Sequence, residues 1–242
     1  MPMRPCLLLT RPQRDSERFA QDMRAAGWQA DILISPVLEI VLHPLAMQQL
    51  AAAKTLVVTS QHAVSALQGT IRQRDWPIWA VGPRTAEAAR EAGFHSVMQS
   101  GGDASALLRD LLHHRPEEPI LHLRGQHAAA DIAQELRARG LRAESLVVYT
   151  QTSLPFSAVG CQRLQRDGDV VIAVFSPRSS RLLAEALRSC SQIRARLHLV
   201  AISNAAAEAF RGFSLARCCI AEHPDAPSMR RAILGIQAKL EP

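Results

Sequence analysis

Hydroxyl, amide and arginine side chains follow the apolar segments of this chain, where an apolar segment ends and a helix-forming segment begins. In a sheet of parallel strands the carboxyl ends meet at one edge, and ligands bind beyond that edge. Helix N-termini there expose N–H groups and a partial positive charge, which favour carboxylate or phosphate groups. The side chains in these positions, predicted to bind substrate, are Arg11, Ser60, Gln61, Arg84, Thr85, Arg124, Ser176, Arg178, Ser179, Ser203 and Asn204.

N-capping is the alternative role for these hydroxyl groups, because Ser, Thr and Asn favour helix starts for structural reasons alone. For any single residue, capping is the stronger interpretation. The set as a whole recurs in both halves of the chain and includes four arginines. It therefore favours a cleft that binds an anionic ligand.

The motifs of the common cofactor-dependent and hydrolytic enzymes are missing from the sequence. There is no GxGxxG after the first apolar run, no GxxxxGK[ST] and no GxSxG. The nine histidines contain no HExxH pair and the five cysteines no CxxC pair, so we expect no metal site. The sequence thus predicts a cofactor-free protein that either binds its ligand or acts on a substrate that is already reactive.

Short apolar runs alternate with amphipathic helical segments from one end of the chain to the other. Most runs are continuously apolar, which is typical of strands covered on both faces. Glycines such as Gly27, Gly93 and Gly140 stand where the helical periodicity stops. The fold class predicted is α/β, with doubly wound parallel sheets.

An internal repeat divides the chain into two similar halves. Ala80-Val81-Gly82 corresponds to Ala201-Ile202-Ser203, and similar helical segments follow both. Asp103-Ala104-Ser105 corresponds to Asp225-Ala226-Pro227-Ser228, and each opens a helix. We therefore expect two five-stranded α/β domains built on one plan.

Two predicted strands, 31–42 and 145–154, are longer than the usual ~5–6 residues. Strands of this length can leave one domain and enter the next, so we place the domain crossings in them. The first domain is expected to comprise residues 1–36 and 154–242, and the second residues 42–146. Residues 37–41 and 147–153 would form a two-stranded antiparallel ladder that joins the two domains.

Tyr149, the only tyrosine of the chain, falls in one of these crossing strands. Tyrosine in such a position is more often a packing residue. A crossing strand can, however, direct the hydroxyl into a cleft shared by two domains. We therefore keep Tyr149 as the candidate catalytic residue.

The net charge of +6 over 242 residues favours an anionic partner. Nucleic acid is one alternative, but the arginines are scattered and no exposed-aromatic pattern accompanies them. The cysteines are expected to be reduced and mostly buried, as in a cytosolic protein. The apolar run at the N-terminus is too short for a signal peptide, and no run reaches ~18 residues. We expect a cytoplasmic protein, a monomer that binds neither nucleic acid nor membrane.

Eight ordered segments resemble the uroporphyrinogen-III synthase family over nearly the whole chain. They are LLLTRP (7–12), SPVLEI (35–40), VVTSQHAV (57–64), WAVGPRTAEAAREAGF (79–94), LHLRG (121–125), LVVYTQT (146–152), VFSPRSS (174–180) and VAIS (200–203). The resemblance implies two α/β domains joined by two antiparallel strands, with both chain ends in the first domain. It implies a cofactor-free lyase that cyclises hydroxymethylbilane, a linear tetrapyrrole with acetate and propionate groups, to uroporphyrinogen III.

The resemblance also implies roles for individual residues. Ser60, Thr85 and Ser176 match cleft residues of the family, and Tyr149 matches the tyrosine proposed as proton donor or hydroxyl-binding group. A phenol with an ordinary pKa of ~10 can donate a proton at neutral pH but is a poor base.

Three places depart from the family pattern. Ser203–Ala206 replace a Gly-Pro-Thr-Thr run, His62 replaces an asparagine, and Ala128-Ala129 stand where an arginine is common. These departures leave an alternative open: a catalytically impaired homologue that binds an anionic ligand with its two domains.

Overall fold

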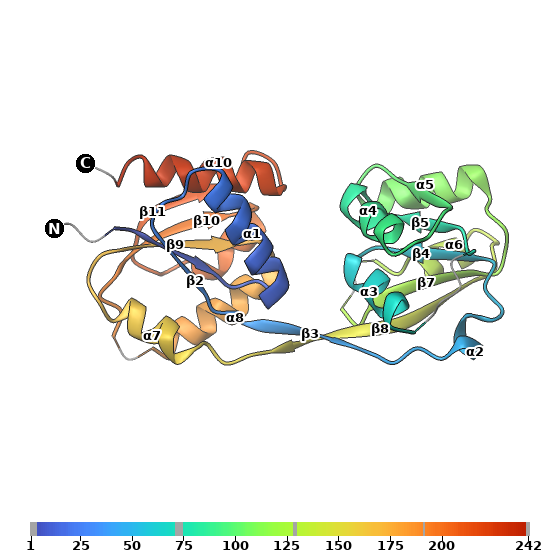
Figure 1. Ribbon diagram of the computed structural model, residues 1–242, viewed down its shortest axis with the longest axis horizontal. Helices are drawn as coiled ribbons and strands as arrows, with labels where there is room; N and C mark the ends of the chain where they lie inside the picture. Colours follow the sequence, from blue (N-terminus) through green and yellow to red (C-terminus); the bar gives the residue numbers. More distant parts are fainter. Residues whose placement is uncertain (1–3, 71–74, 128–129, 191, 241–242) are drawn as a thin grey trace. The chain divides into compact units, whose positions relative to one another are not determined.

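The computed structural model describes residues 4–70, 75–127, 130–190 and 192–240. Internal contacts divide the chain into two compact units (Figure 1). Unit 1 comprises Met1–Glu39 and Thr152–Pro242, and unit 2 comprises Ile40–Gln151. Each unit is an α/β structure with its own sheet.

Unit 1 contains a five-stranded sheet in the order β11-β10-β9-β1-β2, and the register of every neighbouring pair is parallel. Its elements are β1 (Cys6–Leu9), α1 (Gln13–Ala25), β2 (Asp31–Ile34), α7 (Ala158–Leu164), β9 (Asp169–Val174), α8 (Pro177–Arg188), β10 (Arg196–Ala201), α9 (Asn204–Ala207), the 3-10 helix η1 (Glu208–Phe210), β11 (Leu215–Ile220) and α10 (Ala226–Gln237).

Unit 2 is built on a six-stranded sheet in the order β3-β8-β7-β4-β5-β6. Its elements are α2 (Met47–Leu50), β4 (Thr55–Val58), α3 (Gln61–Thr70), β5 (Ile78–Ala80), α4 (Pro83–Glu91), β6 (Val97–Gln99), α5 (Ala104–His114), β7 (Ile120–Gly125) and α6 (Ile132–Arg137). The division between the units falls inside the remaining two strands, β3 (Leu38–Leu42) and β8 (Ala143–Ser153).

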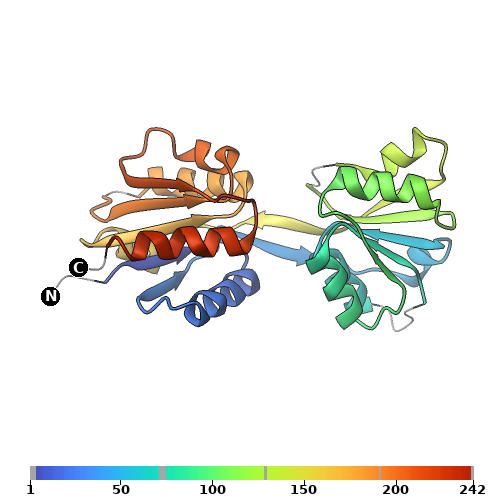
Figure 2. The ribbon, with the colours of Figure 1, turned by 90° about the horizontal axis from the view of Figure 1, so that it is seen from above.

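The alternating directions of side chains in a strand produce two cores in each unit. In β1, Leu7 and Leu9 pack with α1 and α10, whereas Cys6 and Leu8 face the core that includes α7 and α8. In unit 2, Leu56 of β4 lies in the core that α3 and α4 cover, and its neighbour Val57 lies in the core that α5 and α6 cover. Helices therefore cover both faces of each sheet (Figure 2), which explains why the strands read as continuously apolar.

The internal repeat is visible in the strand order. The unit 1 sheet has the strand order β2-β1-β9-β10-β11, and five strands of the unit 2 sheet have the order β8-β7-β4-β5-β6. Strands that correspond in the repeat occupy the same positions in these two orders. The prediction of a repeated, doubly wound α/β fold is confirmed. The prediction of five strands in each half is wrong for unit 2, because β3 adds a sixth strand beside β8.

The two strands that span the division run antiparallel. The amide of His43 donates to the carbonyl of Val148, and the amide of Leu154 donates to the carbonyl of Val37, so numbers rise along one strand as they fall along the other. β8 therefore has a parallel neighbour in β7 and an antiparallel neighbour in β3, which makes the sheet mixed.

The predicted run 31–42 forms two strands, β2 and β3, on either side of Pro36, because proline lacks the N–H group that a ladder requires. One expectation from the sequence is wrong in detail. The cysteines are not mostly buried: Cys6 alone is buried, Cys218 is exposed, and the other three are partly exposed. The helix stops at Gly27 and Gly93 are confirmed, since both adopt a positive φ directly after the C-cap residues of α1 and α4.

Candidate active site

The carboxyl edge of the unit 2 sheet gathers predicted residues that are far apart in the sequence. Ser60 follows β4, Arg84 follows β5, and Arg124 lies at the end of β7. β7, β4 and β5 are adjacent and parallel, so their carboxyl ends lie side by side. The structure thus places an exposed guanidinium (Arg84), a partly exposed hydroxyl (Ser60) and a partly exposed guanidinium (Arg124) along one edge.

The hydroxyl groups at this edge differ in availability. Ser60 Oγ accepts a 3.1 Å hydrogen bond from the amide of His62, near the start of α3, so it acts as a helix cap while remaining partly exposed. Gln61, the first residue of α3, is also partly exposed. Thr85 is only 6% exposed, on the first turn of α4. Ser60 is therefore better placed than Thr85 to meet a ligand.

Tyr149 lies over the end of β7. The register between β7 and β8 shifts at Arg124/Gly125, so that Gly125 pairs with Tyr149, and the amide of Gln126 donates to the Tyr149 carbonyl at 3.0 Å. A Cβ atom on Gly125 would lie 2.5 Å from Cζ of Tyr149 and 2.8 Å from its hydroxyl oxygen. Only glycine therefore permits the ring to occupy this position.

The Tyr149 ring is 8% exposed, and its hydroxyl makes no hydrogen bond with any residue that the structure describes. The His62 ring meets it edge to face, with centroids 5.4 Å apart and an interplanar angle of 66°. His62, which departs from the family pattern, is thus a direct neighbour of the candidate catalytic tyrosine. Among the described residues no hydrogen bond competes for the hydroxyl, so it can donate to a ligand.

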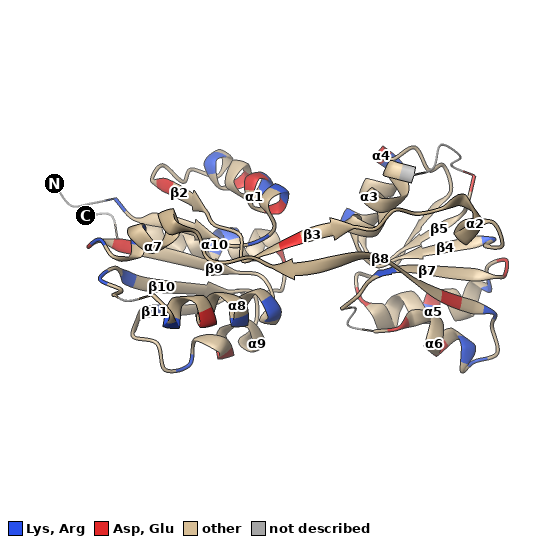
Figure 3. Ribbon diagram, turned by 90° about the horizontal axis from the view of Figure 1, so that it is seen from below, with Lys and Arg blue, Asp and Glu red and all other residues tan. Residues whose placement is uncertain are grey.

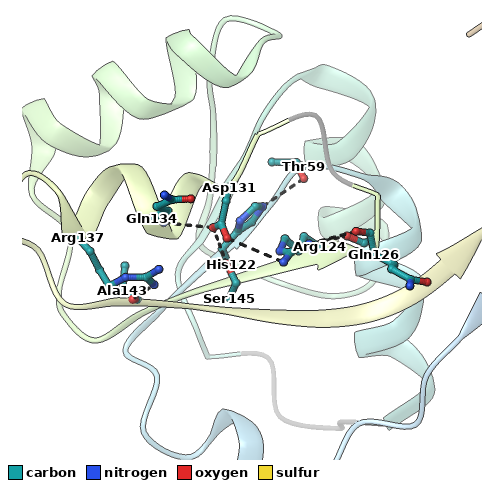
Figure 4. A network of polar contacts seen from close by, with 10 residues as sticks. Thr59, His122, Arg124, Gln126, Asp131, Gln134, Arg137, Ala143 and Ser145 are labelled. Carbon is teal, nitrogen blue, oxygen red and sulfur yellow. Dashed lines mark hydrogen bonds and ion pairs between the residues drawn. The ribbon is translucent and has the colours of Figure 1, made fainter. Parts of the chain in front are cut away.

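Arg124 is held by its own strand end and by the start of α6 (Figure 4). Its Nη1 donates to the carbonyl of Gly125 at 3.1 Å, and its Nη2 lies 3.9 Å from Oδ2 of Asp131. Asp131 in turn accepts a 2.7 Å bond from Ser145 Oγ and caps α6 through the amide of Gln134. Asp131 therefore connects the orientation of Arg124 to α6 and β8.

The hydrogen bonds and charges of this network keep the Asp131 carboxylate ionised. Partial burial opposes ionisation of Asp131, but the bonds from Ser145 and Gln134 and the charge of Arg124 outweigh it, so the pKa is lowered. His122, which is fully buried, has its pKa lowered to about 4, first by burial and then by Arg124, against the opposing charge of Asp131. His122 is therefore neutral at neutral pH, with Nε2 3.3 Å from the hydroxyl oxygen of Thr59.

At the carboxyl edge of unit 1, Arg11 follows β1 and Phe175 follows the neighbouring strand β9. The Arg11 guanidinium lies over the Phe175 ring, 4.6 Å from its centroid, and 3.5 Å from Oδ2 of Asp15. Stacking and ion pairing fix the side chain while leaving it 17% exposed. Arg11 is thus a cation held in place at the predicted edge.

The hydroxyl groups of unit 1 are engaged in capping. Ser176 Oγ accepts from the amide of Ser179 at 3.1 Å and lies 2.7 Å from the Ser179 hydroxyl. Ser203 Oγ accepts from the amide of Ala206 at 3.3 Å. Ser179 is buried, whereas Ser176, Arg178 and Ser203 are partly exposed and Asn204 is exposed.

The described residues contain no group of three or more His, Cys, Asp or Glu that could hold a metal ion. Within the same ranges, no helix is long and apolar enough to cross a membrane. Basic and acidic residues are interspersed along the elements of both units (Figure 3).

A family model described as uroporphyrinogen-III synthase HemD matches residues 17–231. The chain belongs to the uroporphyrinogen-III synthase family. Membership places it among the enzymes of porphyrin and heme biosynthesis. No curated protein sequence matches it significantly.

Solved structures of this family share the fold. Uroporphyrinogen-III synthetase from Helicobacter pylori is 15% identical and matches with a TM-score of 0.67, over 97% of this chain and all of that chain. A mutant uroporphyrinogen III synthase from Thermus thermophilus is 18% identical and matches with a TM-score of 0.50, over 98% of this chain and all of that chain. At these identities the likeness concerns the fold alone.

Three residues of this site were missed in the sequence because nothing local marks them. Asp131 reaches Arg124 from the start of the next helix, and His122 is hidden inside an apolar strand. Gly125 ends the LHLRG segment, and nothing in the sequence shows that its missing side chain makes room for Tyr149. Ala128-Ala129, where the family often has an arginine, lie outside the described residues.

Proposed function

We propose that this protein is an active uroporphyrinogen-III synthase. It converts hydroxymethylbilane to uroporphyrinogen III, with loss of water and inversion of the last pyrrole ring, as a cofactor-free lyase. Tyr149 is the catalytic residue of the proposal. The substrate-binding residues are those predicted from the sequence, at the carboxyl edges of both sheets.

The observation that carries the proposal is the Tyr149 hydroxyl, which lies over the end of β7 at the sheet edge that also bears Arg84 and Arg124. The phenol has no internal hydrogen bond among the described residues, and Gly125 and His62 hold its ring. Loss of the terminal hydroxyl of the bilane requires a proton donor near the departing oxygen. A phenol hydroxyl can supply such a proton or a hydrogen bond.

Substrate recognition in this proposal is the binding of carboxylates by arginines. Arg84 and Arg124 in unit 2 and Arg11 and Arg178 in unit 1 can form charge-assisted bonds with acetate and propionate groups. Holding both ends of a linear tetrapyrrole would let the substituted carbon of the last ring attack the azafulvene. Positioning of this kind can supply ~7–11 kcal/mol of a reaction barrier.

The proposal also covers the oligomeric state, the cellular compartment and the domain limits of the protein. We propose that the protein acts as a monomer in the cytoplasm, and that its two domains have the limits expected from the sequence, 1–36 with 154–242 and 42–146. Five cysteines without a disulfide among them support a reducing compartment.

A coupled assay tests the proposal. Hydroxymethylbilane is generated in situ, the products are oxidised, and the porphyrin isomers are resolved. Because unaided closure gives the symmetric type I isomer, a dominant type III isomer is expected from the active enzyme. Type I alone, from folded protein that still binds the bilane, would instead establish the catalytically impaired binding protein.

A further inference from the structure

Two cysteine sulfur atoms of unit 1 are in contact. Sγ of Cys161 and Sγ of Cys190 lie 3.4 Å apart, although 29 positions separate them in the sequence. Both residues are partly exposed, so a small reagent can reach them. Of the described cysteines, Cys6 and Cys219 place their sulfur atoms against backbone carbonyls instead.

The positions of both cysteines are fixed by buried leucines close to them in the sequence. Cys161 lies on α7, whose Leu164 is 1% exposed, and Cys190 follows α8, whose Leu187 is 1% exposed. Leu164 and Leu187 belong to the same hydrophobic core. The two sulfur atoms therefore face one another because the packing of both helices fixes them, and their effective concentration is high.

Placement of α7 is further fixed at its first turn. Ser157 caps the helix by accepting from the amide of Gly160 at 3.0 Å, and its Oγ bonds Ser35 Oγ at 2.8 Å. The Phe156 ring packs so close to Gly160 that a Cβ there would lie 2.5 Å from Cζ. Cys161 directly follows Gly160, so the Ser157 cap and the packing of Phe156 both help to fix its position.

We propose that Cys161 and Cys190 form a dithiol modification site, which a small disulfide of the glutathione class oxidises to an intramolecular disulfide. A disulfide needs a sulfur–sulfur distance of about 2.05 Å, so closure requires an approach of only about 1.4 Å from the observed 3.4 Å. The proposal is independent of the enzymatic activity.

The reaction proceeds in two balanced exchanges. The Cys161 thiolate attacks one sulfur of the small disulfide, which breaks its S–S bond and releases one thiol. The Cys190 sulfur then attacks the mixed disulfide, loses its proton to the departing thiolate, and releases the second thiol. In total, two protein thiols are oxidised and one small disulfide is reduced to two thiols.

The order of attack follows from the surroundings of Cys190. Burial, and then the neighbouring Cys161 thiol, raise the pKa of Cys190 to about 11. Cys190 therefore holds its proton in the reduced protein, and the first attack falls to Cys161.

The disulfide would lie away from the proposed active site. Ser176 and Ser179 are at the N-terminal end of α8, whereas Cys190 is beyond its C-terminal end. The 12 residues of α8 span about 18 Å. Oxidation should therefore leave activity within a factor of about two. It should raise the melting temperature of unit 1 by several degrees, up to about 10 °C, because it closes a loop across two helices.

The test uses the full chain, reduced and then equilibrated in glutathione buffers of increasing oxidised fraction. Remaining thiols are alkylated, and intact mass and a non-reducing peptide map are recorded. The expected result is a loss of two thiols together, with no bound glutathione at the end point and one crosslink between Cys161 and Cys190.

Matched serine variants make the result specific. Cys161→Ser and Cys190→Ser should each abolish the crosslink and the rise in melting temperature, whereas Cys218→Ser, which changes an exposed thiol, should abolish neither. A stable glutathione adduct on Cys161 in the wild-type protein would overturn the proposal, as would a crosslink to a different cysteine or no loss of thiols at all.

Discussion

Replacing Gly125 by alanine should displace the Tyr149 ring and slow the reaction while leaving the fold intact. The added Cβ would lie 2.5 Å from Cζ, 2.6 Å from Cε2 and 2.8 Å from the hydroxyl oxygen of Tyr149. Reaching an ordinary contact of 3.4 Å from 2.5 Å requires a shift of about 0.9 Å. Gly125 does not have a positive φ, so alanine fits its backbone and the effect comes from the contact alone.

The expected magnitude follows from that shift. A displacement of about 1 Å can lower a rate by about 100-fold, so kcat should fall by one to two orders of magnitude. Overpacking costs about 1–3 kcal/mol in the free energy of unfolding, which a domain of this size should survive. The isomer-resolved assay gives kcat, and urea unfolding gives the stability.

Gly69→Ala is the matched control, because it adds the same methyl group in unit 2. Gly69 is exposed on α3, and a Cβ there meets nothing within 4 Å. This variant should keep wild-type kcat and gain up to about 1 kcal/mol in stability. Tyr149 is the only tyrosine, so its NMR signals after tyrosine labelling report the ring position directly.

Two results would refute the reasoning about Gly125. Wild-type kcat with unshifted Tyr149 signals in Gly125→Ala would mean that the contact does not position the ring. An equal loss of kcat from Gly125→Ala in the wild-type and in the Tyr149→Phe background would mean that the loss does not act through the hydroxyl.

Three further variants test separate parts of the structure. Tyr149→Phe should lower kcat at least about 10-fold without changing the unfolding midpoint, because its hydroxyl has no hydrogen-bond partner among the described residues; unchanged turnover would remove it from the catalytic role. The low pKa of His122 means that the unfolded chain takes up a proton at this residue before the folded protein does, so the free energy of unfolding of the wild type should fall by up to about 3 kcal/mol between pH 6.5 and pH 4. Urea unfolding at several pH values should show a smaller loss in His122→Gln, and identical pH profiles of the two proteins would contradict this role. Asp169→Asn should destabilise unit 1 by about 2 kcal/mol, because the carboxylate bonds His198 and Arg196 at 2.7 Å each; an unchanged denaturation midpoint would show that these bonds add nothing.

The fold class was predictable because local patterns encode it. Continuous apolar runs require cover on both faces of the strands, and alternation with helical segments requires parallel sheets. The repeat added the common plan, which the matching strand orders confirm. The expected antiparallel pairing of 37–41 with 147–153 is present as β3 beside β8. Counting strands failed in unit 2, because β8 also pairs with β7, so this ladder is continuous with the unit 2 sheet and adds β3 to it.

The candidate site was predictable as a region and not as a set of contacts. Arg11, Ser60 and Arg124 fall at strand ends because position after an apolar run fixes which edge a residue joins. The contact partners of the two arginines could not be predicted from the sequence. Phe175 contacts Arg11, and Asp131 contacts Arg124, only in the folded chain.

By itself, the sequence determined the class of fold, the repeated plan and the edges where charged and hydroxyl groups collect, because each depends on periodicities of two or 3.6 residues. Tertiary structure alone decided that Tyr149 lies against Gly125 and that Cys161 meets Cys190. Such contacts depend on how rigid elements pack. Close packing of side chains, rather than the order of residues along the chain, selects which distant atoms touch.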